Sequence, residues 1–207
     1  MSTCPYANKK PCEHTDQSCS FIQKRTGVEN CGLYCLLEKI KEYWMSYKEE
    51  DRRLISMFRD KYVESWNKYR NSRARGRATG KAFEDFILEL LVNYGKIDRE
   101  SLETNKWVPV INEVKYPVDI VYKDKDSIKA VMEIKLGIDI QQAMAFAGLL
   151  GLLNYKFALV MFYEPREDVG KLLLHIQSRH PNNFRYFSVI KEPERTKNAL
   201  VSFIKSN

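Results

Sequence analysis

The stretch from Tyr116 to Gly137 constrains the fold of this 207-residue chain more than any other. It reads YPVDIVYKDKDSIKAVMEIKLG, with apolar or alternating segments at 118–122 and 129–134 around a charged segment at 123–127. Alternation with a period of two residues on both sides of a polar turn is typical of two paired strands. The sequence therefore predicts a β-hairpin.

Three charged residues interrupt the apolar pattern of this hairpin. Asp119 lies on the first strand, and Glu133 and Lys135 lie on the second, where residues two apart point to the same face. A carboxylate in an apolar strand is costly unless it is paired, and here two carboxylates lie beside a lysine. A divalent cation would balance their charge. The alternative is a strand whose edge charges are simply solvated.

The segments that flank the hairpin predict an α/β fold. Residues 80–95 form an amphipathic pattern that ends at Gly95 and carries Glu84 at the border of its apolar stripe. After the hairpin, residues 139–153 predict a helix that is too apolar to be exposed, and residues 157–163 predict a buried strand. The order is helix, strands, helix, strand.

This order and its charged residues resemble the PD-(D/E)xK nuclease superfamily. The matching residues are Pro117 and Asp119 on the first strand, with Val118 inserted between them, and Glu133-Ile134-Lys135 on the second. The resemblance covers residues 80–163. It implies a restriction-endonuclease-like core of helix, mixed β-sheet and helix, which we expect to span residues 80–207.

The resemblance also implies a reaction, the hydrolysis of phosphodiester bonds in DNA by an Mg²⁺- or Mn²⁺-dependent endonuclease. Asp119, Glu133 and the main-chain carbonyl of Ile134 would bind the cation, because hard cations prefer oxygen ligands. Lys135 would orient or help to deprotonate the attacking water. The products would carry 5′-phosphate and 3′-hydroxyl ends.

Two further residues resemble accessory groups of the superfamily. Glu84 matches the acidic residue on the helix before the core strands, and it would bind a second metal or fix a metal-bound water. A solvated helical glutamate is the alternative. Gln141 resembles the glutamine that some branches place beside the active site, whereas a helix-capping or surface glutamine is the other interpretation.

All five cysteines lie within residues 1–35, together with one histidine; they are Cys4, Cys12, His14, Cys19, Cys31 and Cys35. In a reducing compartment such clustering favours a metal, because thiolates in a segment without an apolar core are held together by Zn²⁺ or by an iron–sulfur cluster. Zinc is expected before iron–sulfur, and unconnected thiols or disulfides are the alternative. We therefore predict a cysteine-rich, metal-binding head over residues 1–35.

Residues 36–79 predict a helical and basic arm. Large apolar side chains recur at spacings of three and four from residue 33 to about residue 70, with a bend expected in the charge run at 48–53. Such a stripe packs on the nuclease core or on another subunit, which is compatible with a homodimer; stacking on bases is the alternative.

A basic segment closes the arm. Its cations are Arg70, Arg73, Arg75, Arg77 and, just beyond it, Lys81. Arginines on a flexible segment at the entrance of a metal site would hold a nucleic-acid backbone over the carboxylates. A solvated linker between domains is the alternative.

Composition is consistent with a folded protein that binds a polyanion. The net charge is +7, the pI is about 9.1 and 44% of the residues are apolar. With no apolar run of signal-peptide or membrane-span length, we expect a cytoplasmic protein with DNA as its partner and no membrane. Two other functions fit the sequence, a non-catalytic nucleic-acid-binding protein with a zinc-stabilised head and a zinc-stabilised protein-interaction module.

Overall fold

The structure, a computed structural model, describes residues 31–69, 74–111 and 113–206. The chain divides into two compact units, Met1–Ala82 and Phe83–Asn207, and the division falls inside helix α4 (Arg75–Glu89). The predicted ligands Cys4, Cys12, His14 and Cys19 lie outside the described residues, as do Arg70 and Arg73.

In the first unit, helices α2 (Gly32–Trp44) and α3 (Glu49–Lys68) each bury one apolar face. The bend between them lies at residues 45–48, just before the charge run at 48–53 where the sequence predicts it. The acidic residues Glu49, Glu50 and Asp51 instead form the first turn of α3, where they interact favourably with the positive end of the helix dipole.

The aromatic stripe of α3 is buried. Tyr62 and Trp66 are 3% and 5% exposed, and their rings stack with centroids 6.2 Å apart. The guanidinium of Arg75 lies 4.5 Å from the centre of the Trp66 ring, a cation–π contact. These two buried rings are not available to bases, whereas packing of the stripe on the nuclease core or on another subunit stays a prediction.

The second unit is an α/β fold with a five-stranded mixed sheet. After α4 follow the π-helix η2 (Leu90–Tyr94), the 3-10 helix η3 (Arg99–Ser101), β1 (Leu102–Ile111), β2 (Val114–Asp124), β3 (Ser127–Lys135), α5 (Ile140–Leu150), β4 (Lys156–Met161), α6 (Glu167–Arg179), β5 (Phe184–Ser188) and α7 (Pro193–Lys205). The sheet order is β1-β2-β3-β4-β5. The β1–β2 and β2–β3 pairs are antiparallel, whereas β3–β4 and β4–β5 are parallel. The predicted fold class is confirmed.

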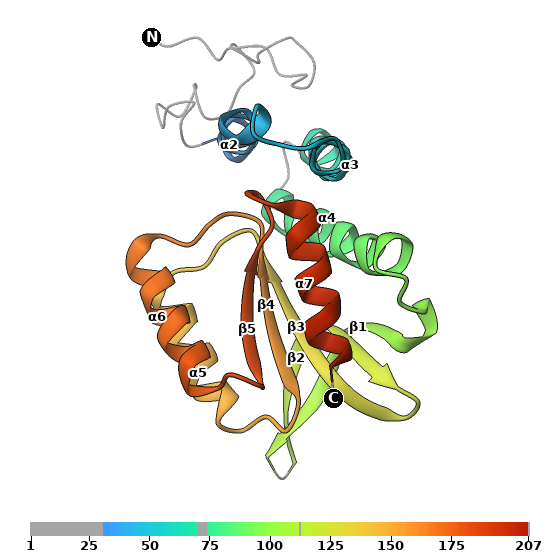
Figure 1. Cartoon of the computed structure of the whole chain (residues 1–207), viewed down its shortest axis with the longest axis vertical. Coiled ribbons are helices and arrows are strands. Elements are labelled where there is room, and N and C mark those ends of the chain that lie inside the picture. The colour runs from blue at the N-terminus through green and yellow to red at the C-terminus, as the bar shows by residue number, and fades with distance from the viewer. Residues whose placement is uncertain (1–30, 70–73, 112, 207) are drawn as a thin grey trace. The chain divides into compact units, whose positions relative to one another are not determined.

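The parallel strands are covered on both faces. Parallel neighbours need crossover connections, and here α5 and α6 supply them. Figure 1 shows α5 and α6 together on one side of the sheet and α7 on the other. Strand β4 is therefore buried along its length from Phe157 to Met161, which explains its continuous apolar sequence.

One helix differs in extent from its expected segment. Strand β1 forms an edge of the sheet, and the buried residues Val169, Leu173 and Ile176 of α6 recur at helical spacing. Helix α4 begins at Arg75, not at residue 80, so Arg75, Arg77 and Lys81 lie on a helix.

Gly95 ends the helical segment, as the sequence predicts, but for a different reason. Its φ of −83° is ordinary for any residue, and the left-handed residue is Lys96, with a φ of 52°. A Cβ on Gly95 would lie 2.7 Å from the carbonyl oxygen of Leu91 and 2.7 Å from Cγ2 of Val201. Close approach of η2 to α7 therefore requires glycine here.

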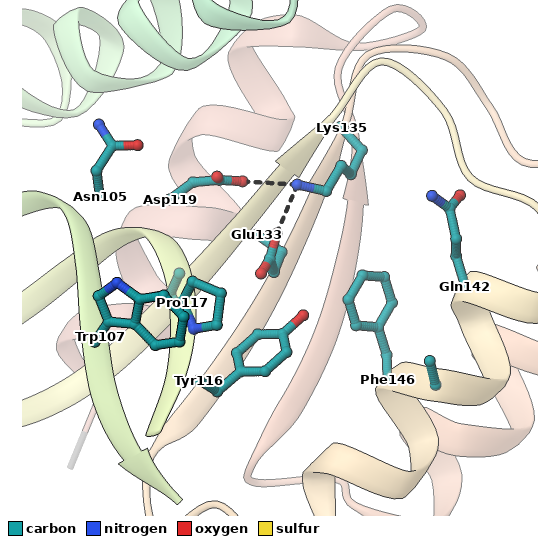
Figure 2. A pocket seen from close by; sticks show the side chains of 11 residues that line it. Asn105, Trp107, Tyr116, Pro117, Asp119, Glu133, Lys135, Gln142 and Phe146 are labelled. Atoms are coloured by element: carbon teal, nitrogen blue, oxygen red, sulfur yellow. Dashed lines mark hydrogen bonds and ion pairs between the residues drawn. The ribbon is translucent and has the colours of Figure 1, made fainter. Parts of the chain in front are cut away.

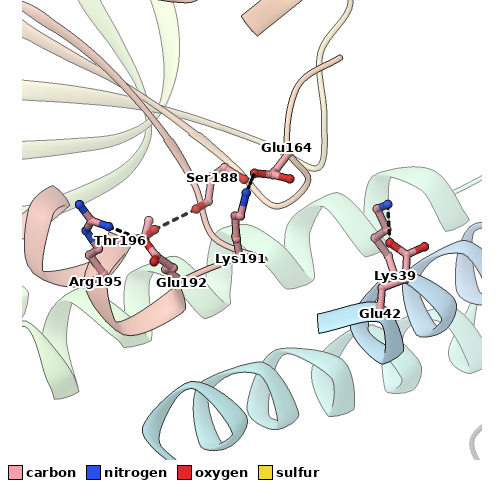
Figure 3. A network of polar contacts seen from close by, with 8 residues as sticks. All are labelled: Lys39, Glu42, Glu164, Ser188, Lys191, Glu192, Arg195 and Thr196. Carbon is pink, nitrogen blue, oxygen red and sulfur yellow. Dashed lines mark hydrogen bonds and ion pairs between the residues drawn. The ribbon is translucent and has the colours of Figure 1, made fainter. Parts of the chain in front are cut away.

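Polar contacts fix the corner between β5 and α7 (Figure 3). The Thr196 hydroxyl donates to the main-chain oxygen of Ser188 at 2.8 Å, and Lys191 pairs with Glu164 at 3.3 Å. Both this pair and the pair of Arg195 with Glu192 are exposed, so the ion pairs contribute little stability. The hydroxyl bond joins the first turn of α7 directly to the end of β5.

Candidate functional site

The predicted hairpin is confirmed as β2 and β3, and its register aligns the two carboxylates. The ladder runs from Asp124↔Ser127 to Ile120↔Met132, and one further step places Asp119 opposite Glu133. Directly opposite residues have side chains on the same face of the sheet. The spacing alone predicts this convergence, because side chains alternate along both strands.

One ammonium group joins the two carboxylates. Lys135 Nζ lies 3.0 Å from Asp119 Oδ2 and 2.7 Å from Glu133 Oε2 (Figure 2). The exposed fractions of the side chains fall from 33% at Lys135 through 17% at Asp119 to 5% at Glu133. The Glu133 carboxylate is thus the most deeply buried charge of the three, and the lysine faces the solvent side.

The backbone of Ile134 takes part in this arrangement. Its N–H donates to Asp119 Oδ2 at 2.7 Å, so the Asp119 side chain binds an amide that faces β2. In an antiparallel pair the N–H and C=O of one residue point toward the same neighbouring strand. The Ile134 carbonyl therefore faces the same side as Asp119, where the sequence analysis predicts a main-chain ligand for the cation.

Burial dominates the electrostatics of Glu133. It raises the pKa of this carboxyl from its ordinary value of 4.5 to about 7, while Lys135 lowers the pKa and the negative Asp119 raises it further. For Lys135, burial alone would lower the pKa, but the charges of Glu133 and Asp119 outweigh it and raise the pKa above its usual range. Lys135 is therefore an ammonium at neutral pH, beside a carboxyl that titrates near neutrality.

This titration predicts how stability depends on pH. Because the folded pKa of Glu133 lies above the unfolded one, the folded state binds the proton more tightly, so stability is lost as pH rises from about 4.5 to about 7. In EDTA, Glu133→Gln should lack this loss and exceed the wild type in free energy of unfolding at pH 8. Urea denaturation at pH 5, 6, 7 and 8 measures the difference.

A matched control separates burial from the loss of any glutamate. The Glu167 side chain is 83% exposed on α6, and Glu167→Gln should follow the wild-type pH profile. Parallel profiles of the wild type and Glu133→Gln would show instead that Glu133 titrates normally in the folded protein.

The three charged side chains line an open cavity of about 470 Å³. Its lining comprises Asn105, Trp107, Tyr116, Pro117, Val118, Asp119, Glu133, Lys135, Gln142, Ala145 and Phe146. Figure 2 shows Asn105 and Trp107 of β1 on one side, and Gln142 and Phe146 of α5 on the other. The cavity thus lies between the edge strand of the sheet and the first crossover helix.

Tyr116 is a site residue that the sequence analysis missed. Burial raises the pKa of its phenol to about 12, and a hydrogen bond to Glu133 raises it too. The phenol therefore stays protonated beside the buried carboxylate. A signal was present, since a tyrosine two residues before a buried strand needs a partner for its hydroxyl and Asp119 follows three residues later.

The accessory residues are placed differently from the central three. Glu84 is half-buried on α4 and is absent from the cavity lining. In the part of the chain that the structure describes, no three His, Cys, Asp or Glu side chains are grouped closely enough to hold a metal, so Glu84 forms no such group with Asp119 and Glu133. On α5 it is Gln142, not Gln141, that lines the cavity, and Gln142 also closes a capping box with Asp139.

The zinc site and the nucleic-acid-binding role of the basic arm stay predictions. Two of the predicted zinc ligands, Cys31 and Cys35, lie among the described residues. Cys31 is buried at the start of α2 and Cys35 is exposed one turn later, with the Cys35 N–H bonded to the Cys31 oxygen at 2.9 Å. Among the described helices, none combines the length and apolarity needed to cross a membrane.

Comparison with known proteins adds a distant likeness to two solved structures. No known family and no curated protein matches the sequence. Can2 from Sulfobacillus thermosulfidooxidans, in complex with cyclic tetra-adenylate, is 14% identical with a TM-score of 0.45 over 66% of this chain and 37% of that one. Protein VC1899 from Vibrio cholerae is 17% identical with a TM-score of 0.44 over 65% and 36%. The chain thus spans little more than a third of either structure.

Proposed function

We propose that this chain is a divalent-metal-dependent nuclease that hydrolyses phosphodiester bonds. The observation that carries the proposal is the placement of Lys135 Nζ within 3.0 Å of both Asp119 and Glu133, on adjacent strands and in an open cavity. Carboxylates beside a lysine supply the groups that phosphodiester hydrolysis needs, a cation site and a donor for the attacking water.

The donor set fits Mg²⁺ or Mn²⁺. Magnesium is usually held by one or two carboxylates, keeps several waters and takes its remaining ligands from substrate phosphates. Asp119 and Glu133 supply the two carboxylates, and the carbonyl of Ile134 faces the same strand gap. Oxygen donors without sulfur or imidazole favour such a hard cation over zinc.

The cation, Lys135 and Tyr116 would have separate roles in the reaction. When bound, the cation would polarise the scissile phosphate and lower the pKa of a water. Lys135, held as an ammonium by its two carboxylates, donates a hydrogen bond to the attacking water and offsets negative charge that develops on the phosphate. Tyr116 fixes the orientation of the Glu133 carboxylate through its hydroxyl.

Within this reaction class we propose DNA as the substrate and internal cleavage as the mode. The net charge of +7 favours a polyanion. Arg77 and Lys81 lie near the start of α4, where their charges would contact a phosphate backbone. Two metal predictions remain. Glu84 is predicted to bind a second metal, and residues 1–35 are predicted to bind zinc; measuring the metal content of the purified protein tests each.

Cleavage assays test the proposal. The purified full-length chain is incubated with supercoiled plasmid, single-stranded circular DNA, linear duplex and a four-way junction, in Mg²⁺, Mn²⁺ or EDTA. Closed circles have no ends, so their cleavage establishes endonuclease activity. We expect cleavage that requires the metal and that Asp119→Asn abolishes.

The control for this assay is an aspartate far from the cavity. Asp168 on α6 is 52% exposed, and Asp168→Asn should cleave like the wild type. Cleavage that survives in Asp119→Asn would indicate a contaminating nuclease and contradict the proposal. DNA binding without cleavage by any protein would favour the non-catalytic binding function instead.

A further inference from the structure

Trp107 is unusual because its large apolar side chain is 66% exposed beside the charged site. Most exposed apolar residues need no explanation, but a tryptophan buries more area than any other side chain when it finds a partner. The indole is part of the cavity lining, together with Tyr116 and Pro117. The exposed ring therefore borders the place where a substrate would lie.

The sheet fixes where the indole lies relative to the carboxylates. Trp107 pairs with Pro117 in the β1–β2 register, and Asp119 follows Pro117 by two residues on the same face. Two residues along a strand span roughly 7 Å. A planar group on the indole would thus lie about one nucleotide from the carboxylates and Lys135.

Asn105 is a second residue of β1 that borders the cavity beside Trp107. The pairs Thr104↔Ile120 and Lys106↔Val118 place it opposite Asp119, and it also lines the cavity. Its φ of 53° is left-handed, a conformation that asparagine adopts more readily than most other residues. Its amide both donates and accepts hydrogen bonds, so it is suited to the edge of a base.

Two exposed lysines lie on the strands that carry the indole. Lys115 precedes Pro117 by two residues and so shares the face of Trp107, whereas Lys106 pairs with Glu103 at 3.7 Å. Lysines beside an aromatic ring form the pattern of single-strand binding, in which cations follow the backbone and rings stack on bases. An apolar protein partner would gain nothing from these charges.

From these observations we infer that Trp107 is a stacking platform for an unpaired base, and that the substrate is therefore single-stranded nucleic acid or a single-stranded segment of a duplex. In a duplex both faces of a base are already stacked, so the indole would first have to displace a neighbour. The inference rests on the proposed function, since it names the substrate form of the same site.

Binding of matched oligonucleotides tests the platform. A fluorescein-labelled single strand and the same strand in a blunt duplex are titrated with the full-length chain in Ca²⁺, and gels confirm that both stay intact. Fluorescence anisotropy should show tighter binding of the single strand. Trp107→Ala should weaken single-strand binding about tenfold and leave duplex binding within about twofold, while Trp107→Phe, which keeps an aromatic face, retains most of the affinity.

The control variant lies on the same hairpin but outside the cavity lining. Ile111 is 50% exposed, and Ile111→Ala should bind like the wild type. Intrinsic fluorescence gives a second readout, because a base stacked on Trp107 quenches the wild type and not Trp107→Phe.

The outcomes separate this inference from the proposed function. If DNA is bound and cleaved but Trp107→Ala loses no single-strand affinity, or loses single-strand and duplex affinity equally, the platform is overturned and the nuclease stands. If neither the wild type nor any variant binds or cleaves either oligonucleotide, the proposed function fails and the platform fails with it.

Discussion

Lys135→Met should lower the rate of DNA cleavage by at least about 10²-fold, because it removes the only ammonium within hydrogen-bond distance of both carboxylates among the described residues. Metal binding should respond differently. The ammonium competes with a divalent cation for Asp119 and Glu133, so the variant should bind Mn²⁺ at least as tightly as the wild type at pH 8.5. Calorimetric titration with Mn²⁺ and initial cleavage rates measure the two effects.

Asp119→Asn provides the contrast for this experiment. It removes a carboxylate and keeps the shape of the side chain, so it should lose Mn²⁺ affinity and cleavage together. If Lys135→Met also loses Mn²⁺ affinity, the lysine supports the fold of the site rather than the chemistry. If the variant cleaves at the wild-type rate, Lys135 has no part in the reaction.

Phe157→Ala should lower the free energy of unfolding by about 3–5 kcal/mol, as expected when a buried aromatic side chain is truncated. Phe157 is fully buried in β4, and its ring centroid lies 5.5 Å from that of Phe146 and 6.0 Å from that of Phe184. Truncation leaves a cavity that neighbouring strands and α5 hold open. Urea denaturation, followed by far-ultraviolet circular dichroism, measures the loss.

Leu174 supplies the comparison for this core substitution. It is 55% exposed on α6, and Leu174→Ala should change stability by less than about 0.5 kcal/mol. Phe146 lines the candidate cavity and packs on Phe157, so Phe157→Ala should also weaken the proposed single-strand binding at temperatures where the protein remains folded. Equal stability of Phe157→Ala and Leu174→Ala would mean that β4 is not part of the core.

The charged centre was predictable because its geometry is local. Strand alternation and a short turn suffice to bring Asp119, Glu133 and Lys135 to one face. The order of helices and strands was predictable for a similar reason. The hydrophobic pattern that identifies each element lies entirely within the residues of that element. The end of the helix at Gly95 was also predicted, although the contact with Val201 that requires glycine there is long-range.

The remainder of the cavity depends on long-range packing. Trp107 reaches the site only because β1 pairs with β2 in one register, which the sequence of β1 does not specify. The choice between Gln141 and Gln142 depends on helix phase, in which one residue turns a side chain by about 100°. Asp139 sets that phase by capping α5 through the Gln142 N–H at 2.8 Å.

The start of α4 was mispredicted because two signals conflict. Gly76 and Gly80 suggest a linker, but arginine and alanine between them favour a helix. Arg75 then contacts the Trp66 ring at 4.5 Å. This contact joins two different helices, α3 and α4, so it cannot be predicted from the sequence of either helix alone.

The mixed topology of the sheet has a consequence for the order of folding. The β2–β3 hairpin that pairs Asp119 with Glu133 closes a short loop, whereas the wall formed by α5 requires the longer parallel crossover to β4. We therefore expect the carboxylates to meet early, while water still surrounds them and their repulsion costs little. Phe146 of α5 would complete the cavity wall later, so part of the burial that raises the pKa of Glu133 would be acquired only then.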